Sequence, residues 1–182
     1  MQKKRMIPHI TAALWGFAEA TIFFIVPDVF LTYRGLKGYR SAVLSCLYVL
    51  AGALLGGVLM FVWAQHSVQA INFVQHVPAV TTQMASTARS DYAHHGVVAL
   101  LIAPFKGIPY KLYTVIAPEF GVGIISFTLV SALARFGRFV ITAMITAALS
   151  SYLSKWLSHR QRAVILAIFW VVFYALYFYR NL

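Results

Sequence analysis

Long apolar stretches alternate with short basic loops along the chain. Residues 41–64 form the cleanest stretch and contain no charged residue. With a rise of about 1.5 Å per residue, a helix of this length covers the roughly 30 Å hydrocarbon core of a bilayer. Residues 163–179 form a second apolar stretch that is rich in aromatic side chains. Both stretches are predicted to be transmembrane helices.

Small residues recur within residues 41–64. Gly52 and Gly56 lie four positions apart, and this spacing lets another helix approach closely at that face. Packing inside one subunit and dimerisation both fit the pattern. We expect packing inside the subunit, and a homo-oligomer remains an open alternative.

Residues 119–152 are predicted to form a third and longer transmembrane helix. Pro118 suits the first position of such a helix, and Glu119 suits its first turn. The helix would be about 50 Å long, so it must tilt, project or bend. Gly137 is the candidate for a bend.

Two further apolar segments are interrupted by residues that do not suit a continuous membrane helix. Residues 10–33 contain Glu19, and later Pro27 followed by Asp28. Residues 97–117 and the next position are interrupted by Pro104, Lys106, Gly107, Pro109, Lys111 and Pro118. Each proline removes a backbone donor and disfavours helix at the residue before it. Non-helical backbone at membrane depth needs protein or a water-filled cavity around it, so both segments are predicted to be re-entrant helical hairpins.

The polar region 66–95 is predicted to be an extracytoplasmic or interfacial segment, namely a loop with an interfacial helix. Pro78 interrupts it. Apolar residues at helical spacing occur on its first half, which favours a short amphipathic helix there.

Composition shows what class of protein carries this pattern. Charged residues make up only 10% of the chain and hydrophobic residues 61%, whereas a soluble domain has roughly 25% charged residues. The chain is therefore predicted to be an all-α integral membrane protein with one domain, residues 1–182, and a soluble globular protein is excluded. Its basic N-terminus resembles a signal peptide, but Glu19 and Pro27 interrupt the apolar part, so we expect it to be retained.

The net charge of +11 is explained most simply by loops that orient a membrane protein, or by attraction to anionic lipid. Nucleic-acid binding is not expected, because the basic residues are dispersed and some lie in apolar stretches. If both interrupted segments re-enter, nine basic residues face the cytoplasm, namely Lys3, Lys4, Arg5, Arg34, Lys37, Arg40, Lys155, Arg160 and Arg162. Only Arg89 and Arg180 then lie outside. If both interrupted segments crossed the membrane completely, seven basic residues would face the cytoplasm and four would lie outside. The positive-inside rule thus favours a multi-pass protein with re-entrant segments and a cytoplasmic N-terminus.

The same arrangement contains an internal repeat of pattern. An interrupted segment entering from the cytoplasm precedes residues 41–64, and one entering from the other side precedes residues 119–152. The two units are related by inversion, which is a recurrent plan among transporters whose discontinuous segments meet near the midplane.

Arg135 and Arg138 are the most informative charges in the apolar regions. A charge at the centre of a helix in hydrocarbon costs at least roughly 2.5–3.5 kcal/mol, so its presence needs a reason. Their i, i+3 spacing puts both on one helix face, and each guanidinium suits a phosphate or a carboxylate. One possible role of the two arginines is to bind a lipid phosphate. The other is purely structural, in which they pair with Glu19 and Asp28 or extend to the cytoplasmic interface.

The other charges in apolar regions leave similar alternatives. Glu19 is a candidate proton carrier or a member of a structural salt bridge. Asp28 shares the proton-carrying role or caps the turn of the first hairpin. Lys106 and Lys111 flank Pro109, and they line a polar cavity or extend to the interface.

Enzymatic chemistry is not expected, because the chain contains no metalloprotease, P-loop or dinucleotide-binding motif and no Ser/His/Asp spacing. Cys46 is the only cysteine, so an intramolecular disulfide is excluded, and we expect it to be buried. His94 and His95 are adjacent, which suits a loop better than a metal site. We expect no catalytic residues, no metal and no cofactor.

The segment FAEATIFFIVPDVFL resembles the first re-entrant motif of the DedA family in the VTT-domain (SNARE-associated Golgi protein) superfamily, and is most similar to short YqaA-like members. PFKGIPYKLYTVIAP resembles the basic, proline-containing hairpin of the family, and ARFGRF resembles the arginine-bearing helix that follows it. The resemblance covers residues 15–149. Lys106 stands where the family commonly has arginine, and the usual proline pair is reduced to Pro27.

This resemblance implies two inverted re-entrant hairpins and a flippase or scramblase of the bacterial cytoplasmic (inner) membrane. The substrate would be a phospholipid or undecaprenyl phosphate, with proton coupling as a further expectation. Glu19 and Asp28 would be the proton-coupling pair, and the lipid phosphate would be bound by Arg135, Arg138, Lys106 and Lys111. The alternatives are a membrane scaffold or assembly factor with structural salt bridges, and a small proton or ion pathway.

Overall fold

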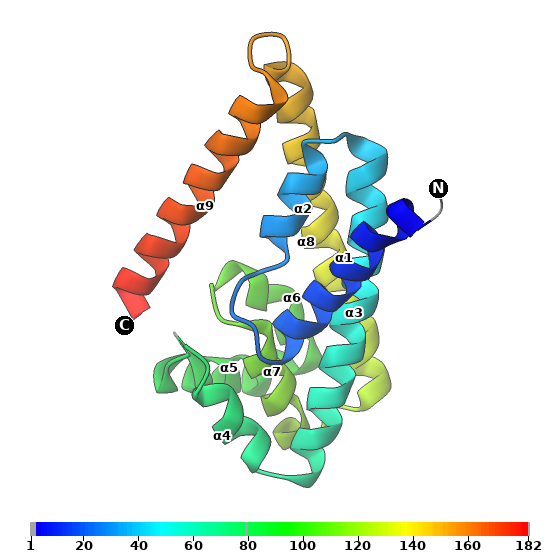
Figure 1. Cartoon of the computed structure of the whole chain (residues 1–182). Coiled ribbons are helices and arrows are strands. Elements are labelled where there is room, and N and C mark those ends of the chain that lie inside the picture. The colour runs from blue at the N-terminus through cyan, green and yellow to red at the C-terminus, as the bar shows by residue number, and fades with distance from the viewer. Residues whose placement is uncertain (1–2, 79, 182) are drawn as a thin grey trace.

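The computed structural model describes residues 3–78 and 80–181, and in these ranges the regular structure is entirely helical (Figure 1). The α-helices are α1 Lys3–Thr21, α2 Asp28–Gly35, α3 Tyr39–His66, α4 Gln69–Gln75, α5 Thr82–His95, α6 Ala99–Ile102, α7 Tyr110–Ile116, α8 Ile124–Leu153 and α9 His159–Asn181. Short 3-10 turns occupy Gly96–Val98, Ala103–Phe105 and Ala117–Phe120. Residues 1, 2, 79 and 182, which include the first two positions of the expected cytoplasmic N-terminus, lie outside the described residues.

Three helices are long and apolar enough to cross a membrane: α3, α8 and α9. They correspond to the three predicted transmembrane helices, so that part of the sequence-based prediction is confirmed. The predicted start of the long helix at Glu119 is wrong, since α8 begins at Ile124. Gly121 adopts a left-handed backbone with φ 66°, which ends the preceding 3-10 turn and separates it from α8. The helix then runs unbroken through Gly137.

The first interrupted segment consists of α1, a six-residue break and α2. The chain reverses direction across the break, and α2 runs back toward the end of the molecule where α3 begins (Figure 1). Side chains bind the exposed backbone of the break. Trp15 Nε1 donates to the Ile25 carbonyl at 3.2 Å, and the Val26 amide donates to the Tyr174 hydroxyl at 2.8 Å. The predicted interruption at 10–33 is therefore present and well bonded.

The second interrupted segment is also broken, as the prolines predicted. Helix α6 is only one turn long, a 3-10 turn follows it, and α7 begins immediately after Pro109. Helix α7 then leads toward the end of the molecule where α8 begins (Figure 1). In each half of the chain a broken segment thus precedes a long apolar helix, and α3 and α8 run in opposite directions.

The small residues of α3 receive α1, which confirms packing within the subunit. A Cβ atom at Gly52 would overlap the backbone carbonyl of Ala13, and one at Gly56 would lie 2.8 Å from the Phe17 carbonyl oxygen. Cys46 is fully buried on the same helix, as expected. Backbone contact this close is possible only where the side chain is a hydrogen atom.

The region 66–95 is more ordered than predicted, because it forms two helices, α4 and α5, instead of a loop with one interfacial helix. Thr81 caps α5 by accepting a hydrogen bond from the Met84 amide at 3.2 Å. Buried Tyr92 of α5 donates to the Tyr113 carbonyl of α7 at 2.9 Å. Helix α5 therefore supports the second interrupted segment from the side.

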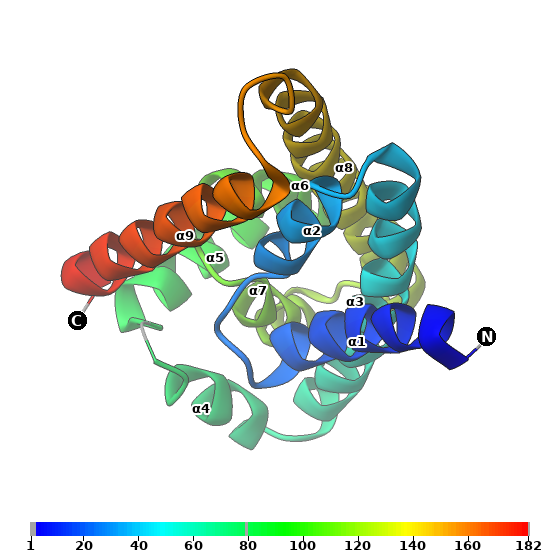
Figure 2. The same cartoon turned by 45° about the horizontal axis from the view of Figure 1, so that its top comes forward.

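Helix α2 is surrounded by three long helices. Figure 2 shows α2 near the centre with α3, α8 and α9 around it. A Cβ atom at Gly35 would meet the Ala143 carbonyl oxygen at 3.0 Å, so α2 packs closely on α8. Trp170 Nε1 of α9 donates to Thr32 Oγ1 of α2 at 3.0 Å. The side of α9 that carries Trp170 thus faces α2.

Substitution of Gly52 by alanine should destabilise the protein by about 1–3 kcal/mol, because the added methyl group forces α1 away from α3. Gly137→Ala is the matched control, since a Cβ atom there meets no heavy atom within 4 Å. Its expected effect is zero or a stabilisation of up to about 1 kcal/mol from helix propensity. Unfolding of the full chain in detergent, followed by circular dichroism, measures both. Equal stability of Gly52→Ala and wild type would contradict the observed packing.

Candidate functional site

A cavity of about 700 Å³ lies between the two interrupted segments and the long helices α8 and α9. The first segment contributes α2 to its wall. Both breaks contribute to it, through Phe23, Phe24 and Val26 on one side and Gly107, Ile108 and Pro109 on the other. The wall formed by α9 is mainly aromatic, with Phe169, Trp170, Phe173, Tyr174 and Tyr177. The charged lining residues are Glu19, Asp28, Lys111, Arg138 and Arg162. One cavity therefore combines an apolar wall with a cluster of charges.

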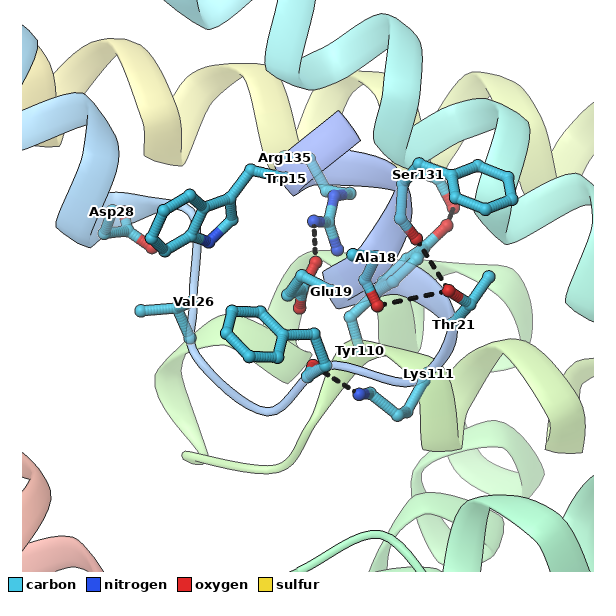
Figure 3. Close-up of polar contacts among 12 residues, drawn as sticks. Trp15, Ala18, Glu19, Thr21, Val26, Asp28, Tyr110, Lys111, Ser131 and Arg135 are labelled. Carbon is cyan, nitrogen blue, oxygen red and sulfur yellow. Dashed lines mark hydrogen bonds and ion pairs between the residues drawn. The ribbon is translucent and has the colours of Figure 1, made fainter. Parts of the chain in front are cut away.

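Glu19 of α1 and Arg135 of α8 form a buried ion pair (Figure 3). The Arg135 guanidinium lies 4.1 Å from the ring centroid of Tyr110, whose hydroxyl donates to Ser131 Oγ at 3.0 Å. Glu19 lines the cavity, whereas Arg135 is not among the lining residues. Arg135 thus sits behind the carboxylate and joins α1, α7 and α8.

Asp28 and Arg138 form a second ion pair between α2 and α8. Both residues line the cavity. The Asp28 side chain is 9% exposed and the Arg138 side chain 33% exposed. The guanidinium can therefore reach a ligand in the cavity while it remains bound to its carboxylate.

Lys111 is almost completely buried and connects the two interrupted segments. Its Nζ atom donates to the Phe23 carbonyl in the first break at 2.6 Å (Figure 3). No carboxylate lies within ion-pair distance of Lys111 in the described ranges, 3–78 and 80–181. Its other two donor positions make no hydrogen bond to the described part of the protein, and Lys111 lines the cavity.

Lys106 lies elsewhere, because Asp91 of α5 holds it in an ion pair outside the cavity. The same carboxylate accepts a hydrogen bond of 2.5 Å from the Tyr113 hydroxyl. Burial alone would raise the pKa of Asp91, but the bonds from Lys106 and Tyr113 lower it below its usual value. The structure does not bring Lys106 together with Arg135, Arg138 and Lys111, which the sequence had grouped with it.

Glu119 was expected in the first turn of the long helix, and instead it binds Arg89 of α5 through two hydrogen bonds of 2.8 and 3.0 Å. This bond raises the pKa of Arg89. All four acids of the chain are therefore paired with a cation, since Glu19, Asp28 and Asp91 are paired as well. The sequence offered ion pairs with Glu19 and Asp28 as one role for Arg135 and Arg138, and the structure contains both of these pairs.

Arg162 is a lining residue that sequence analysis assigned only to a cytoplasmic loop. It lies in the first turn of α9 and donates to Ser150 near the end of α8, with 2.9 Å to the carbonyl and 2.5 Å to the hydroxyl. No motif signals this contact, because it depends on how the loop after α8 folds back. The cavity therefore has three cationic lining residues against two acidic ones.

Within residues 3–78 and 80–181, no three His, Cys, Asp or Glu side chains gather as ligands for a metal ion. The carboxylates of the cavity are instead occupied by guanidinium groups.

Sequence comparison finds two relatives of similar length. The chain is 27% identical over 146 residues to a protein of Haemophilus influenzae, and this match covers 74% of the chain and 72% of the relative. It is 26% identical over 144 residues to a protein of Histophilus somni, and this match covers 73% of the chain and 71% of that relative. Both relatives are described as uncharacterized proteins. No family model matches the chain. No solved structure matches it.

Glu19→Gln should destabilise the protein by about 3–5 kcal/mol, because it leaves the buried Arg135 without a counter-charge. The double variant Glu19→Gln/Arg135→Gln should recover part of that loss, since it removes both charges together. Asp28→Asn should cost less, because Arg138 is partly exposed. Unfolding of the full chain in detergent measures all three, and a double variant less stable than Glu19→Gln would rule out the pairing as the cause.

Proposed function

We propose that the protein is a flippase or scramblase that moves a phosphate-bearing lipid, such as a phospholipid or undecaprenyl phosphate, across a bacterial cytoplasmic membrane. The observation that carries the proposal is the cavity with a cationic cluster beside an aromatic wall. A lipid phosphate suits the cations, and its acyl or prenyl chain suits the wall and the surrounding bilayer. The resemblance to the DedA family agrees with this function.

Lys111 and Arg138 are the proposed phosphate ligands. Both line the cavity, and Lys111 has no carboxylate partner in the described part of the chain. The fork of donors of Arg138 suits two oxygens of one phosphate, whereas Lys111 adds a point charge. Arg135 supports the site from behind by holding Glu19, and Lys106 is left out of it because of its bond to Asp91.

Glu19 and Asp28 are the proposed proton-responsive groups. Asp28 occupies part of the Arg138 guanidinium, which a phosphate would otherwise bind, and the negative charge of Glu19 lines the same cavity and repels an anion there. Protonation removes the charge of the carboxylate and leaves the guanidinium available for the substrate. Proton binding would in this way strengthen lipid binding, and release of the proton would weaken it.

Placement in the membrane follows from the same proposal. In it, the two interrupted segments are re-entrant hairpins that meet near the midplane, and the hydrogen bond from Lys111 to Phe23, which joins the two segments, supports this. Basic loops 34–40 and 155–162 lie together at the end where α3 begins and α8 ends (Figure 1). By the positive-inside rule this end, and the N-terminus, are cytoplasmic.

A second candidate is a membrane scaffold whose ion pairs are purely structural. The observation that favours it is the pairing of all four acids. It differs from the transport proposal in one consequence: neutral substitution of a whole ion pair should then leave function intact, because only the balance of charge matters.

Reconstituted vesicles with a fluorescent lipid in the inner leaflet test the transport proposal. Lys111→Met/Arg138→Gln should slow movement of a phosphate-bearing lipid at least tenfold, since two charged contacts to the phosphate are lost. Lys155→Met/Arg160→Gln is the matched control, because it removes the same charge outside the cavity and should change the rate less than twofold.

Asp28→Asn/Arg138→Gln separates the two candidates, because it removes a carboxylate and its partner together. The transport proposal expects slow lipid movement in this variant even when its unfolding temperature equals that of the wild type. Wild-type rates in this variant and in Lys111→Met/Arg138→Gln would rule out Lys111 and Arg138 as the phosphate ligands. No lipid movement by the wild type would end the transport proposal and leave the scaffold.

A further inference from the structure

The cavity has a second polar region near the basic end of the molecule. Arg162 of α9 and Ser150 of α8 both line it there and bind one another. The Arg162 Nη1 atom makes the bonds to Ser150, whereas its Nε atom is buried and has no hydrogen-bond partner among the described residues. A buried donor without a partner is unfavourable, and an anion beside it would stabilise it.

The charge of Arg162 is not neutralised by the protein. The four acids of the chain bind Arg89, Lys106, Arg135 and Arg138. Among the described residues, Arg162 is bound only to the neutral Ser150. A guanidinium in this position attracts an anion, and its planar fork suits a phosphate better than a spherical ion.

Hydroxyl groups connect this region to the ion-paired end of the cavity. Thr142 and Thr146 line the cavity between Arg138 and Ser150, and the four residues follow one another at intervals of four. Each interval is about 6 Å along a helix, so the row extends about 18 Å. Thr146 Oγ1 donates to the Thr142 carbonyl at 2.9 Å, so its hydroxyl is satisfied in apolar surroundings and is still able to accept a bond.

We propose that Arg162 and Ser150 form a capture site for the phosphate group of a lipid, and that Thr142 and Thr146 form a polar track from there to Arg138. This inference rests on the proposed function. The phosphate enters at the basic end, contacts Arg162 first and passes along α8. Apolar neighbours on the same face, Ile145 and Leu149, accompany the lipid chain.

Binding to the detergent-solubilised full chain tests the capture site directly, with short-chain phosphatidic acid as probe. The background is Asp28→Asn/Arg138→Gln, in which the deep arginine and its carboxylate are both neutral. Addition of Arg162→Gln should weaken binding about tenfold. Arg160→Gln, an exposed arginine two residues away that does not line the cavity, should change it less than twofold.

Two further probes identify the source of the phosphate. Short-chain diacylglycerol, which lacks phosphate, should bind equally to the Arg162→Gln and Arg160→Gln variants. Inorganic phosphate should bind at least tenfold more weakly than phosphatidic acid. Inorganic phosphate that binds as tightly as the lipid would overturn a lipid capture site and indicate a site for free phosphate.

Transport by reconstituted vesicles tests the order of the two sites. Arg162→Gln in the otherwise wild-type chain should raise the lipid fraction needed for half-maximal rate about tenfold and change the maximal rate less than twofold. Thr142→Val/Thr146→Val should lower the maximal rate, whereas Thr128→Val, which removes a hydroxyl of α8 outside the cavity, should not. Arg162→Lys keeps the charge and should recover part of the affinity.

The outcomes separate this inference from the proposed function. Unchanged affinity and transport in Arg162→Gln would overturn the capture site and leave the transport proposal standing. No lipid movement by the wild type, together with binding that depends on Arg162, would overturn the transport proposal and leave a lipid-binding site. The unfolding temperature of each variant shows whether a loss comes from the site or from the fold.

Discussion

Two ion pairs attach the first interrupted segment to α8, and the rest of the architecture depends on them. Arg135 holds Glu19 of α1, and Arg138 holds Asp28 of α2. Because six residues outside any helix separate α1 from α2, these pairs fix both arms of the segment to one long helix. In surroundings of low dielectric, removal of one partner leaves a charge that nothing else compensates. In the proposed function, the same pairs would also determine when a guanidinium is available to a ligand.

The first break is stabilised by side chains from other segments that bind its backbone. Trp15 and Lys111 donate to carbonyl groups of the first break, and the Tyr174 hydroxyl of α9 accepts from one of its amides. Backbone without such partners would be costly in a bilayer. Lys111 consequently has two tasks, since one donor holds the break and the others face the cavity. The same contact sets the distance between the two interrupted segments and so the depth of the charged site.

The sequence predicted the features that depend on local pattern. Apolar length predicted α3, α8 and α9, prolines predicted the interrupted segments, and the GxxxG spacing predicted close packing on α3. The i, i+3 spacing also placed Arg135 and Arg138 on a common face, with Glu19 and Asp28 as possible partners.

Features that depend on distant contacts could not be predicted in this way. The late start of α8 follows from the left-handed backbone of Gly121. Lys106 leaves the predicted cluster because Asp91, a residue assigned to a polar loop, is folded against it. Arg162 enters the cavity only because the loop after α8 brings the start of α9 over Ser150. Whether the two segments enter and leave the membrane on the same side depends on the bilayer, so re-entry stays a prediction.

The balance of charge indicates what kind of molecule completes the cavity. Lys111, Arg138 and Arg162 line it with Glu19 and Asp28, and the other two acids of the chain are held on α5 and before α8. The protein therefore has no further carboxylate with which to neutralise the cavity. A small inorganic anion would satisfy the cations but leave the aromatic wall of α9 without a partner. An apolar molecule would have the opposite deficiency. An amphiphile with an anionic head would satisfy both surfaces at once, and this complementarity is the reason for proposing a lipid that carries phosphate.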